Sequence, residues 1–137
     1  MAKSLKTWMV PPRRPPKPKT PKSLKVEVSE RANKLVETEL KPRHVKPPPK
    51  KPRFNYIIDI TTRWYRNYFY FVAVYASPGP TAISPTFELK FARLEYVGEE
   101  RFALSYLRHN DKWFELFPDL SLDECLEAVR DQPHFLG

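Results

Sequence analysis

The chain has 137 residues, a length that accommodates one folded domain and a tail. Its 24 Lys+Arg against 16 Asp+Glu give a net charge of +8, and the single cysteine, Cys125, excludes an intramolecular disulfide and a cysteine-based metal site. The sequence has no run of about 18 apolar residues and no apolar signal core within Met1–Val10, so we expect neither a membrane span nor secretion. These features favour a cytoplasmic protein.

Charge and proline are unevenly divided along the sequence. Residues 1–53 hold 16 Lys+Arg and 4 Asp+Glu, a net charge of +12, with 11 of the 16 prolines. Residues 54–137 hold 8 Lys+Arg and 12 Asp+Glu, a net charge of −4, and the two sums recover +8. The division predicts three segments: a basic Pro-rich arm over 1–22, a helix plus a Pro-rich linker over 23–53, and a compact α+β body over 54–137.

The arm contains a basic proline tract, Pro11 to Pro21, with the sequence PPRRPPKPKTP. Proline fixes φ and removes a backbone donor, so the tract is expected to be an extended polyproline II segment. Residues 24–40 then carry apolar side chains at helical spacing, which predicts a helix with Ser23 as its N-cap and Pro42 as its stop. The second proline segment, residues 41–53, is predicted to be a linker.

The densest aromatic stretch follows, and it predicts two antiparallel strands, Phe54–Thr62 and Tyr68–Ala76, joined by Arg63 to Asn67. The second strand is apolar on both faces, which is unusual for a strand with one side in water. We therefore expect it to be central in the sheet. One face would be covered by a helix, and the other by a further element or a second subunit.

Alternating apolar residues predict three more strands, which form a meander. Their expected ranges are Thr86–Val97, Arg101–Arg108 and Lys112–Phe117. Pro118 and Asp119 are expected to break the sheet. Ser121 and Glu124 have capping-box spacing and predict the start of a C-terminal helix with an apolar stripe. The whole pattern predicts an α+β fold: an antiparallel sheet of about five strands with an N-terminal and a C-terminal helix, preceded by the extended arm.

The C-terminal half resembles a family of small bacterial proteins of unknown function, over roughly residues 87–137. The segments that carry the resemblance are FARLEYV (91–97), FALSYLRH (102–109), Lys112-Trp113 and LSLDECLEAVRDQPHFLG (120–137). The family often ends in Phe-Trp-Gly, whereas this chain ends in Phe-Leu-Gly. The resemblance implies a compact α+β domain. It implies no reaction and supplies no catalytic residues.

The sequence contains no convincing set of catalytic residues. The three histidines, His44, His109 and His134, lie in a predicted linker, a turn and the chain end, and Cys125 falls on the apolar stripe of the last helix. No phosphate-cradling glycine motif and no metal-ligand spacing is present. We expect a non-enzymatic protein without cofactor or metal.

Binding is the favoured function. The arm's charge predicts non-specific attraction to nucleic acid, RNA or DNA, with aromatic side chains of the 63–67 turn stacking on bases. The alternative is a protein-interaction or structural module, as a homodimer or with the arm wrapped around an acidic protein partner. The candidate contact residues are Arg13, Arg14, Lys17, Lys19, Lys22, Lys46, Lys50, Lys51, Arg53, Arg63, Trp64, Tyr65 and Arg66.

Overall fold

The computed structural model describes residues 18–45, 55–78, 85–108, 110–132 and 135. Five strands form one antiparallel sheet in the order β1-β2-β3-β4-β5. Their bounds are β1 Tyr56–Tyr65, β2 Tyr68–Ala76, β3 Thr86–Gly98, β4 Arg101–Leu107 and β5 Trp113–Ser121. The helical elements are α2 Lys22–Leu35, the π-helical turn η2 Val36–Leu40, α3 Lys41–His44 and α4 Leu122–Asp131. The predicted α+β class, strand number and terminal helices are confirmed.

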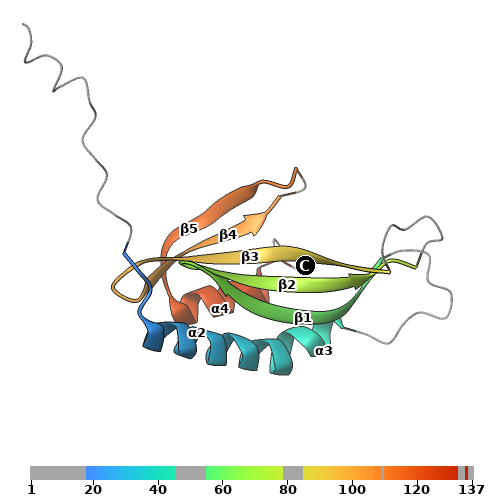
Figure 1. Ribbon diagram of the computed structural model, residues 1–137, viewed down its shortest axis with the longest axis horizontal. Helices are drawn as coiled ribbons and strands as arrows, with labels where there is room; N and C mark the ends of the chain where they lie inside the picture. The colour runs from blue at the N-terminus through green and yellow to red at the C-terminus, as the bar shows by residue number, and fades with distance from the viewer. Residues whose placement is uncertain (1–17, 46–54, 79–84, 109, 133–134, 136–137) are drawn as a thin grey trace, which may run out of the picture.

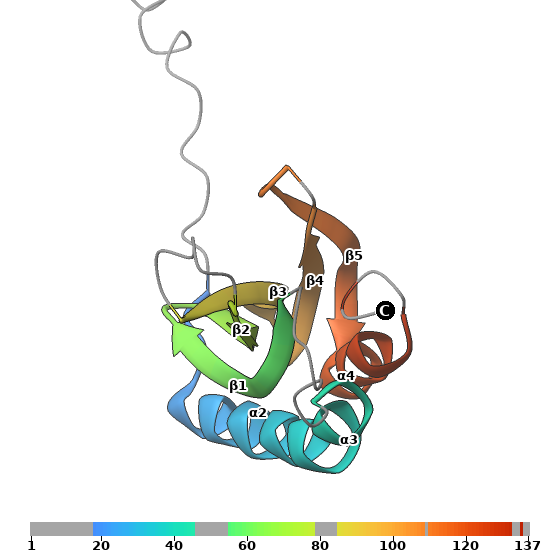
Figure 2. The same cartoon turned by 90° about the vertical axis from the view of Figure 1, so that its right-hand side faces the viewer.

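The helices of the described residues pack on the same side of the sheet. Figure 1 shows α2 and α3 below β1, and Figure 2 shows α4 next to the same helical layer, at the foot of β5. Side chains of both helices and all the strands join one core. Fully buried examples are Val28 from α2, Phe71 from β2 and Cys125 from α4. We call this the helix-covered face of the sheet.

The N-terminal helix differs from its predicted limits at both ends. It begins at Lys22 after Pro21, and no side chain caps it, so the prediction of Ser23 as N-cap is wrong. Nor does Pro42 stop it. The π-helical turn shifts the hydrogen bonding, with the Lys41 N–H donating to the Val36 carbonyl, and places Pro42 in the first turn of α3. A proline is tolerated there because no backbone N–H is required.

The predicted connection between the first two strands is shorter than expected. β1 continues to Tyr65, so that Trp64 pairs with Phe69 and Tyr65 with Tyr68. Only Arg66 and Asn67 form the turn, with Arg66 at φ 56°. The turn contains no glycine, and Arg66 adopts the left-handed conformation instead. The predicted strand start at Phe54 lies outside the described residues.

The last strand passes through the residues predicted to break it. Phe117 pairs with Leu104 and Leu120 with Phe102, so Pro118 and Asp119 together oppose the single residue Ala103. Such a bulge bends an edge strand without ending it. Since β5 has only β4 as a neighbour, the N–H that Pro118 lacks need not be part of the ladder.

The C-terminal helix agrees with the sequence. The Glu124 N–H donates to Ser121 Oγ at 3.2 Å, and the Ser121 N–H donates to Glu124 Oε1 at 3.0 Å, which completes the capping box. The predicted apolar stripe is buried, and burial raises the pKa of the Cys125 thiol to about 12. Phe135 packs edge-on against Tyr106, with ring centroids 6.4 Å apart.

Candidate binding surface

The side of the sheet opposite the helices carries a mixed aromatic and cationic surface. Strand pairing places one row across it: Arg63 opposite Tyr70, Tyr70 opposite Arg93, and Arg93 opposite Ser105. Side chains in such a row are close neighbours. We call this surface the open face, since no helix of the described residues covers it. It is defined by Arg63, Tyr65, Tyr68, Tyr70, Val72, Lys90, Arg93 and Trp113.

Cations lie over the aromatic rings of the open face. Lys90 Nζ is 4.7 Å from the centroid of the Tyr70 ring. Arg93 Cζ is 4.8 Å from the Tyr68 centroid and 4.9 Å from the Trp113 centroid. Attraction between a cation and the negative face of a ring holds such pairs together. The guanidinium of Arg93 is therefore in contact with aromatic rings from two different strands.

The base of the open face is well packed. Tyr70 is 8% exposed and Ser105 3%, and Val72 is fully buried. Arg93 Nε is the one buried side-chain nitrogen or oxygen without a hydrogen-bond partner in the described parts of the chain. A buried donor of this kind is unfavourable unless something pairs with it.

A pocket of about 380 Å³ opens beside these rings. Arg63 and Lys90 contribute positive charge to its wall, and Glu88 contributes a carboxylate that accepts from Arg63 Nη2 at 2.8 Å. The remaining lining residues are Val72, Leu89, Leu107 and Trp113. The wall therefore combines two cations, one carboxylate and an apolar floor.

The root of the arm is bound at one corner of the open face. Asn67 Oδ1 accepts from the Thr20 backbone N–H at 3.0 Å and from Thr20 Oγ1 at 2.9 Å. Asn67 Nδ2 donates to the Pro18 carbonyl at 3.0 Å, and the Asn67 carbonyl accepts from the Tyr96 N–H. We call Pro18, Thr20 and Asn67 the arm clasp. It fixes the start of the basic arm next to Arg66 and Tyr68.

The predicted contact residues other than Trp64 fall into three groups. Lys19 and Lys22 are exposed at the arm root, and Tyr65 and Arg66 are exposed at the turn, with Arg66 Cζ 5.3 Å from the Tyr65 ring centroid. Arg63 lies on the open face. The other predicted contacts lie outside the described residues: Arg13, Arg14, Lys17, Lys46, Lys50, Lys51 and Arg53.

Trp64 lies on the helix-covered face, apart from the other predicted contacts of this turn. Its Nε1–H donates to Ser29 Oγ at 3.0 Å and to the Lys25 carbonyl at 3.2 Å. Its ring packs against Phe69, with centroids 5.0 Å apart. These contacts join α2 to β1, so we leave Trp64 out of the surface proposed below.

Sequence reasoning did not single out Tyr68, Tyr70, Lys90, Arg93 or Trp113 as contact residues. The available signal was that β2 is apolar on both faces. The grouping itself depends on a register shift between Phe71 and Val72, opposite β3. That shift puts both Lys90 and Arg93 on the open face, although they are three residues apart.

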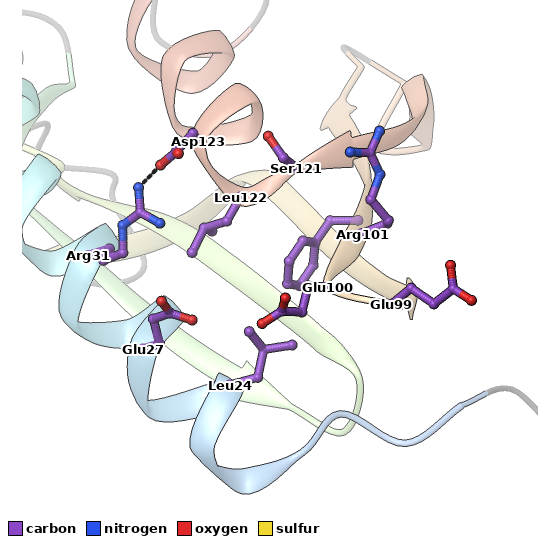
Figure 3. Close-up of a pocket in the computed structure, with 10 residues that line it drawn as sticks. Leu24, Glu27, Arg31, Glu99, Glu100, Arg101, Ser121, Leu122 and Asp123 are labelled. Atoms are coloured by element: carbon purple, nitrogen blue, oxygen red, sulfur yellow. Dashed lines mark ion pairs between the residues drawn. The ribbon is translucent and has the colours of Figure 1, made fainter.

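A second pocket, of about 320 Å³, lies between the start of α2, the β3–β4 turn and the start of α4 (Figure 3). Its two arginines, Arg31 and Arg101, are engaged in ion pairs within the fold. Arg31 pairs with Asp123, and Arg101 Nε donates to Asp119 Oδ1 at 2.7 Å. Hydrogen bonding to Asp119 raises the pKa of Arg101. We assign these contacts to holding α2, α4 and the sheet together.

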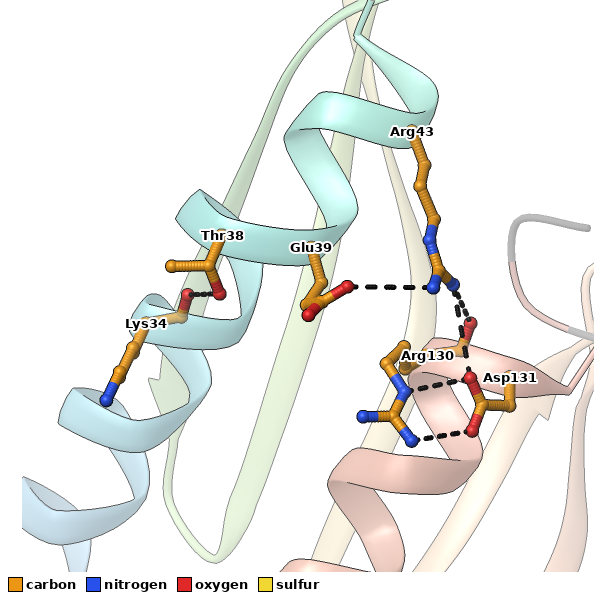
Figure 4. Close-up of polar contacts among 6 residues, drawn as sticks. All are labelled: Lys34, Thr38, Glu39, Arg43, Arg130 and Asp131. Carbon is orange, nitrogen blue, oxygen red and sulfur yellow. Dashed lines mark hydrogen bonds and ion pairs between the residues drawn. The ribbon is translucent and has the colours of Figure 1, made fainter.

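Ion pairs also join the two helical ends (Figure 4). Arg43 Nη1 donates to the Arg130 carbonyl at 3.1 Å, and Arg43 Nη2 lies 3.6 Å from Glu39 Oε2. Arg130 binds Asp131 in a two-pronged pair at 2.8 Å for each bond, which lowers the pKa of Asp131. No group of three or more His, Cys, Asp or Glu in the described ranges is arranged to hold a metal ion.

Comparison with known proteins gives a family without an assigned activity. Within the described residues, no helix is long and apolar enough to cross a membrane. No curated protein and no solved structure matches the chain. A family model described as "Domain of unknown function (DUF3024)" matches residues 19–137, which extends from the arm clasp to the C-terminus. The chain therefore belongs to the DUF3024 family.

Proposed function

We propose that this protein is a non-enzymatic binding protein for single-stranded nucleic acid, either RNA or DNA. The observation that carries the proposal is the arm clasp. It joins the basic arm to the corner where exposed Tyr65 and Arg66 meet the open face. Single-strand binding combines electrostatic attraction with aromatic stacking. The arm clasp brings the basic arm, which supplies the attraction, next to the exposed ring that supplies the stacking.

The electrostatic part comes from the arm and its root. Residues 1–53 hold 16 Lys+Arg and 4 Asp+Glu, whereas the rest of the chain is net negative. Cations that neutralise phosphates release counterions, which gives affinity without sequence preference and a strong salt dependence. The arm therefore attracts the strand, and the acidic body limits the contact to one corner and one face.

The stacking part comes from the turn. Tyr65 is 56% exposed, which makes it the most accessible aromatic ring among the described residues. Its neighbour Arg66 is in the left-handed conformation and lies over its ring. A base can stack on the exposed side of Tyr65 while Arg66 contacts the adjoining phosphate.

Fluorescence anisotropy with a labelled 20-nucleotide RNA and the matching DNA tests the proposal over a range of salt concentrations. The full chain is compared with Arg13→Gln/Arg14→Gln. Losing two phosphate contacts should reduce the slope of log affinity against log salt by roughly 1.4. The matched control Lys34→Gln/Arg108→Gln removes the same charge elsewhere and should leave the slope unchanged. No binding at low salt, or equal slopes for both variants, contradicts the proposal.

A protein partner is the second candidate, and one observation favours it. Val97 of β3 is 42% exposed, and no helix of the described chain covers the open face. A second copy of the chain could cover such a surface. Light scattering of the full chain tests this: a dimer that persists at high salt and excludes nucleic acid would favour the protein-interaction module.

A further inference from the structure

We infer that the open face contains a phosphate-binding site centred on Arg93. One nucleotide of the strand would place its phosphate against Arg93 and Lys90 and its base against Trp113. The inference rests on the proposed function for the nature of the ligand. The residues that carry it are separate from the arm and from the turn.

The surroundings of Arg93 favour the binding of an anion by its guanidinium. Its guanidinium lies within 5 Å of both the Tyr68 and Trp113 ring centroids, which restricts its orientation. Its Nε is buried without a partner among the described residues. Nε–H and one Nη–H form the two-pronged edge that a phosphate accepts from. Arg93 does not itself line the pocket, so its guanidinium has to turn toward Lys90 and Trp113 for the Nε–H to meet a ligand there.

The neighbouring charges add to this site. Lys90 and Arg63 line the pocket beside Trp113, and strand pairing places Tyr70 between Arg63 and Arg93. The one carboxylate in the pocket wall belongs to Glu88, which is paired with Arg63. The open face also carries Glu95, opposite Tyr68, and Glu115, opposite Ser105. An incoming phosphate therefore meets Lys90 and Arg93 in the presence of these carboxylates, and it competes with Glu88 for Arg63.

Pocket size and shape agree with a single nucleotide unit. A volume of about 380 Å³ is near the lower end of the range for small-ligand pockets. Trp113 lines the pocket, and its ring is tilted 43° to that of Tyr70 at a centroid distance of 5.8 Å. A base stacked on the Trp113 ring would extend this pair of rings. The phosphate of the same nucleotide would then contact Lys90 and Arg93 on β3.

Nuclear magnetic resonance can observe this site directly. The indole N–H signals of the three tryptophans are assigned with Trp113→Phe, and the full chain is titrated with thymidine 5′-monophosphate, inorganic phosphate and thymidine. We expect the nucleotide to shift the Trp113 indole and the Arg93 Nε–H signals while the Trp64 indole stays in place. Phosphate alone should shift only Arg93, and thymidine neither. An unmoved Arg93 signal with nucleotide overturns the inference.

Arg93→Lys keeps the charge and removes the planar donor edge, so nucleotide affinity should fall about tenfold. Arg108→Lys is the matched control, because Arg108 Cζ also lies over a ring, 5.2 Å from the Phe114 centroid, away from the pocket. Lys90→Gln provides a second test should Arg93→Lys fail to fold, and it should weaken binding severalfold. Glu88→Gln should strengthen binding. Equal affinities in Arg93→Lys and Arg108→Lys, or unchanged affinity in Lys90→Gln, overturn the inference.

The two proposals fail in different ways. If the nucleotide does not bind but the arm substitutions still reduce the salt slope for the 20-nucleotide strand, the Arg93 site is wrong and nucleic-acid binding stands. If the nucleotide binds but the arm substitutions change nothing, the arm is not the source of attraction. If thymidine 5′-monophosphate binds no more tightly than inorganic phosphate, the site binds a free anion, and the inference that it binds a nucleotide is wrong.

Discussion

The two faces of β2 are both apolar in sequence, yet they have different environments. On the helix-covered face, Phe69 and Phe71 are fully buried against α2, α4 and the other strands. On the open face, Tyr68 and Tyr70 pack against Arg93 and Lys90. Cationic side chains that lie over aromatic rings thus take the place of a second helical layer. A strand without charged residues therefore need not be enclosed between two helical layers.

Substitution of Phe71 should have the largest effect on stability. Phe71→Ala removes a fully buried ring that packs edge-on against Phe69 at 5.5 Å. The lost burial and the cavity should lower the free energy of unfolding by about 3–5 kcal/mol. Urea denaturation measures it. Tyr68→Ala on the open face should cost clearly less, and equal losses would mean that the open face is also core.

Substitution of Asn67 tests the attachment of the arm. Asn67→Ala removes three side-chain hydrogen bonds, two from Thr20 and one to Pro18, which should cost about 1–2 kcal/mol. The Thr20 amide should also lose protection from hydrogen exchange. Thr20→Val is the graded control, since it removes the Oγ1 bond and leaves the backbone bond. Unchanged protection at Thr20 in Asn67→Ala would contradict the clasp.

The capping box of α4 makes a smaller, pH-dependent contribution to the free energy of unfolding. Ser121→Ala should cost about 1 kcal/mol at neutral pH. The Ser121 backbone N–H donates to Glu124 and lowers the pKa of that carboxyl below its ordinary 4.5. A pKa lowered by folding stabilises the fold above the unfolded-state value, and this stabilisation is lost as pH falls through the folded-state value. Glu124→Gln should therefore flatten the stability curve in acid. A curve with the wild-type slope would show that the bond does not form.

The ion pairs between α3 and α4 should matter least. Arg43→Ala loses contacts to Glu39, Asp131 and the Arg130 carbonyl, all at the surface (Figure 4). Exposed pairs of this kind contribute about 0–1 kcal/mol and are screened by salt. The loss measured in urea should shrink further at high salt. A salt-independent loss above about 2 kcal/mol would indicate that the end of the helical run is held by more than charge.

The helices and strands could be predicted from local sequence patterns. Their first and last residues could not, because these depend on hydrogen bonds with adjacent parts of the structure. Ser121 and Glu124 specify their cap within four residues, so α4 was predictable. Pro42 and Pro118 were misjudged because their effect depends on hydrogen bonding elsewhere: a π-helical turn precedes the first, and the second lies in an edge strand.

The open face was less predictable than the strands that build it. Arg93 and Trp113 are 20 residues apart in sequence and meet only through the register of two strand pairs, β3 with β4 and β4 with β5. The turn residues Tyr65 and Arg66 were predictable because they are adjacent in sequence. Trp64, predicted with them, points the other way because β1 continues through it and successive strand residues alternate faces.

The arm clasp also sets the geometry of a tether. In the polyproline II conformation predicted from the sequence, the 17 residues that precede Pro18 would span roughly 50 Å at about 3 Å per residue. Under the proposed function, a strand bound to the arm would reach the open face at an effective concentration on the order of millimolar. Weak contacts of the arm and of the open face with one strand would then combine as a bivalent interaction. Moving the arm clasp to another place on the domain would weaken binding without altering either contact.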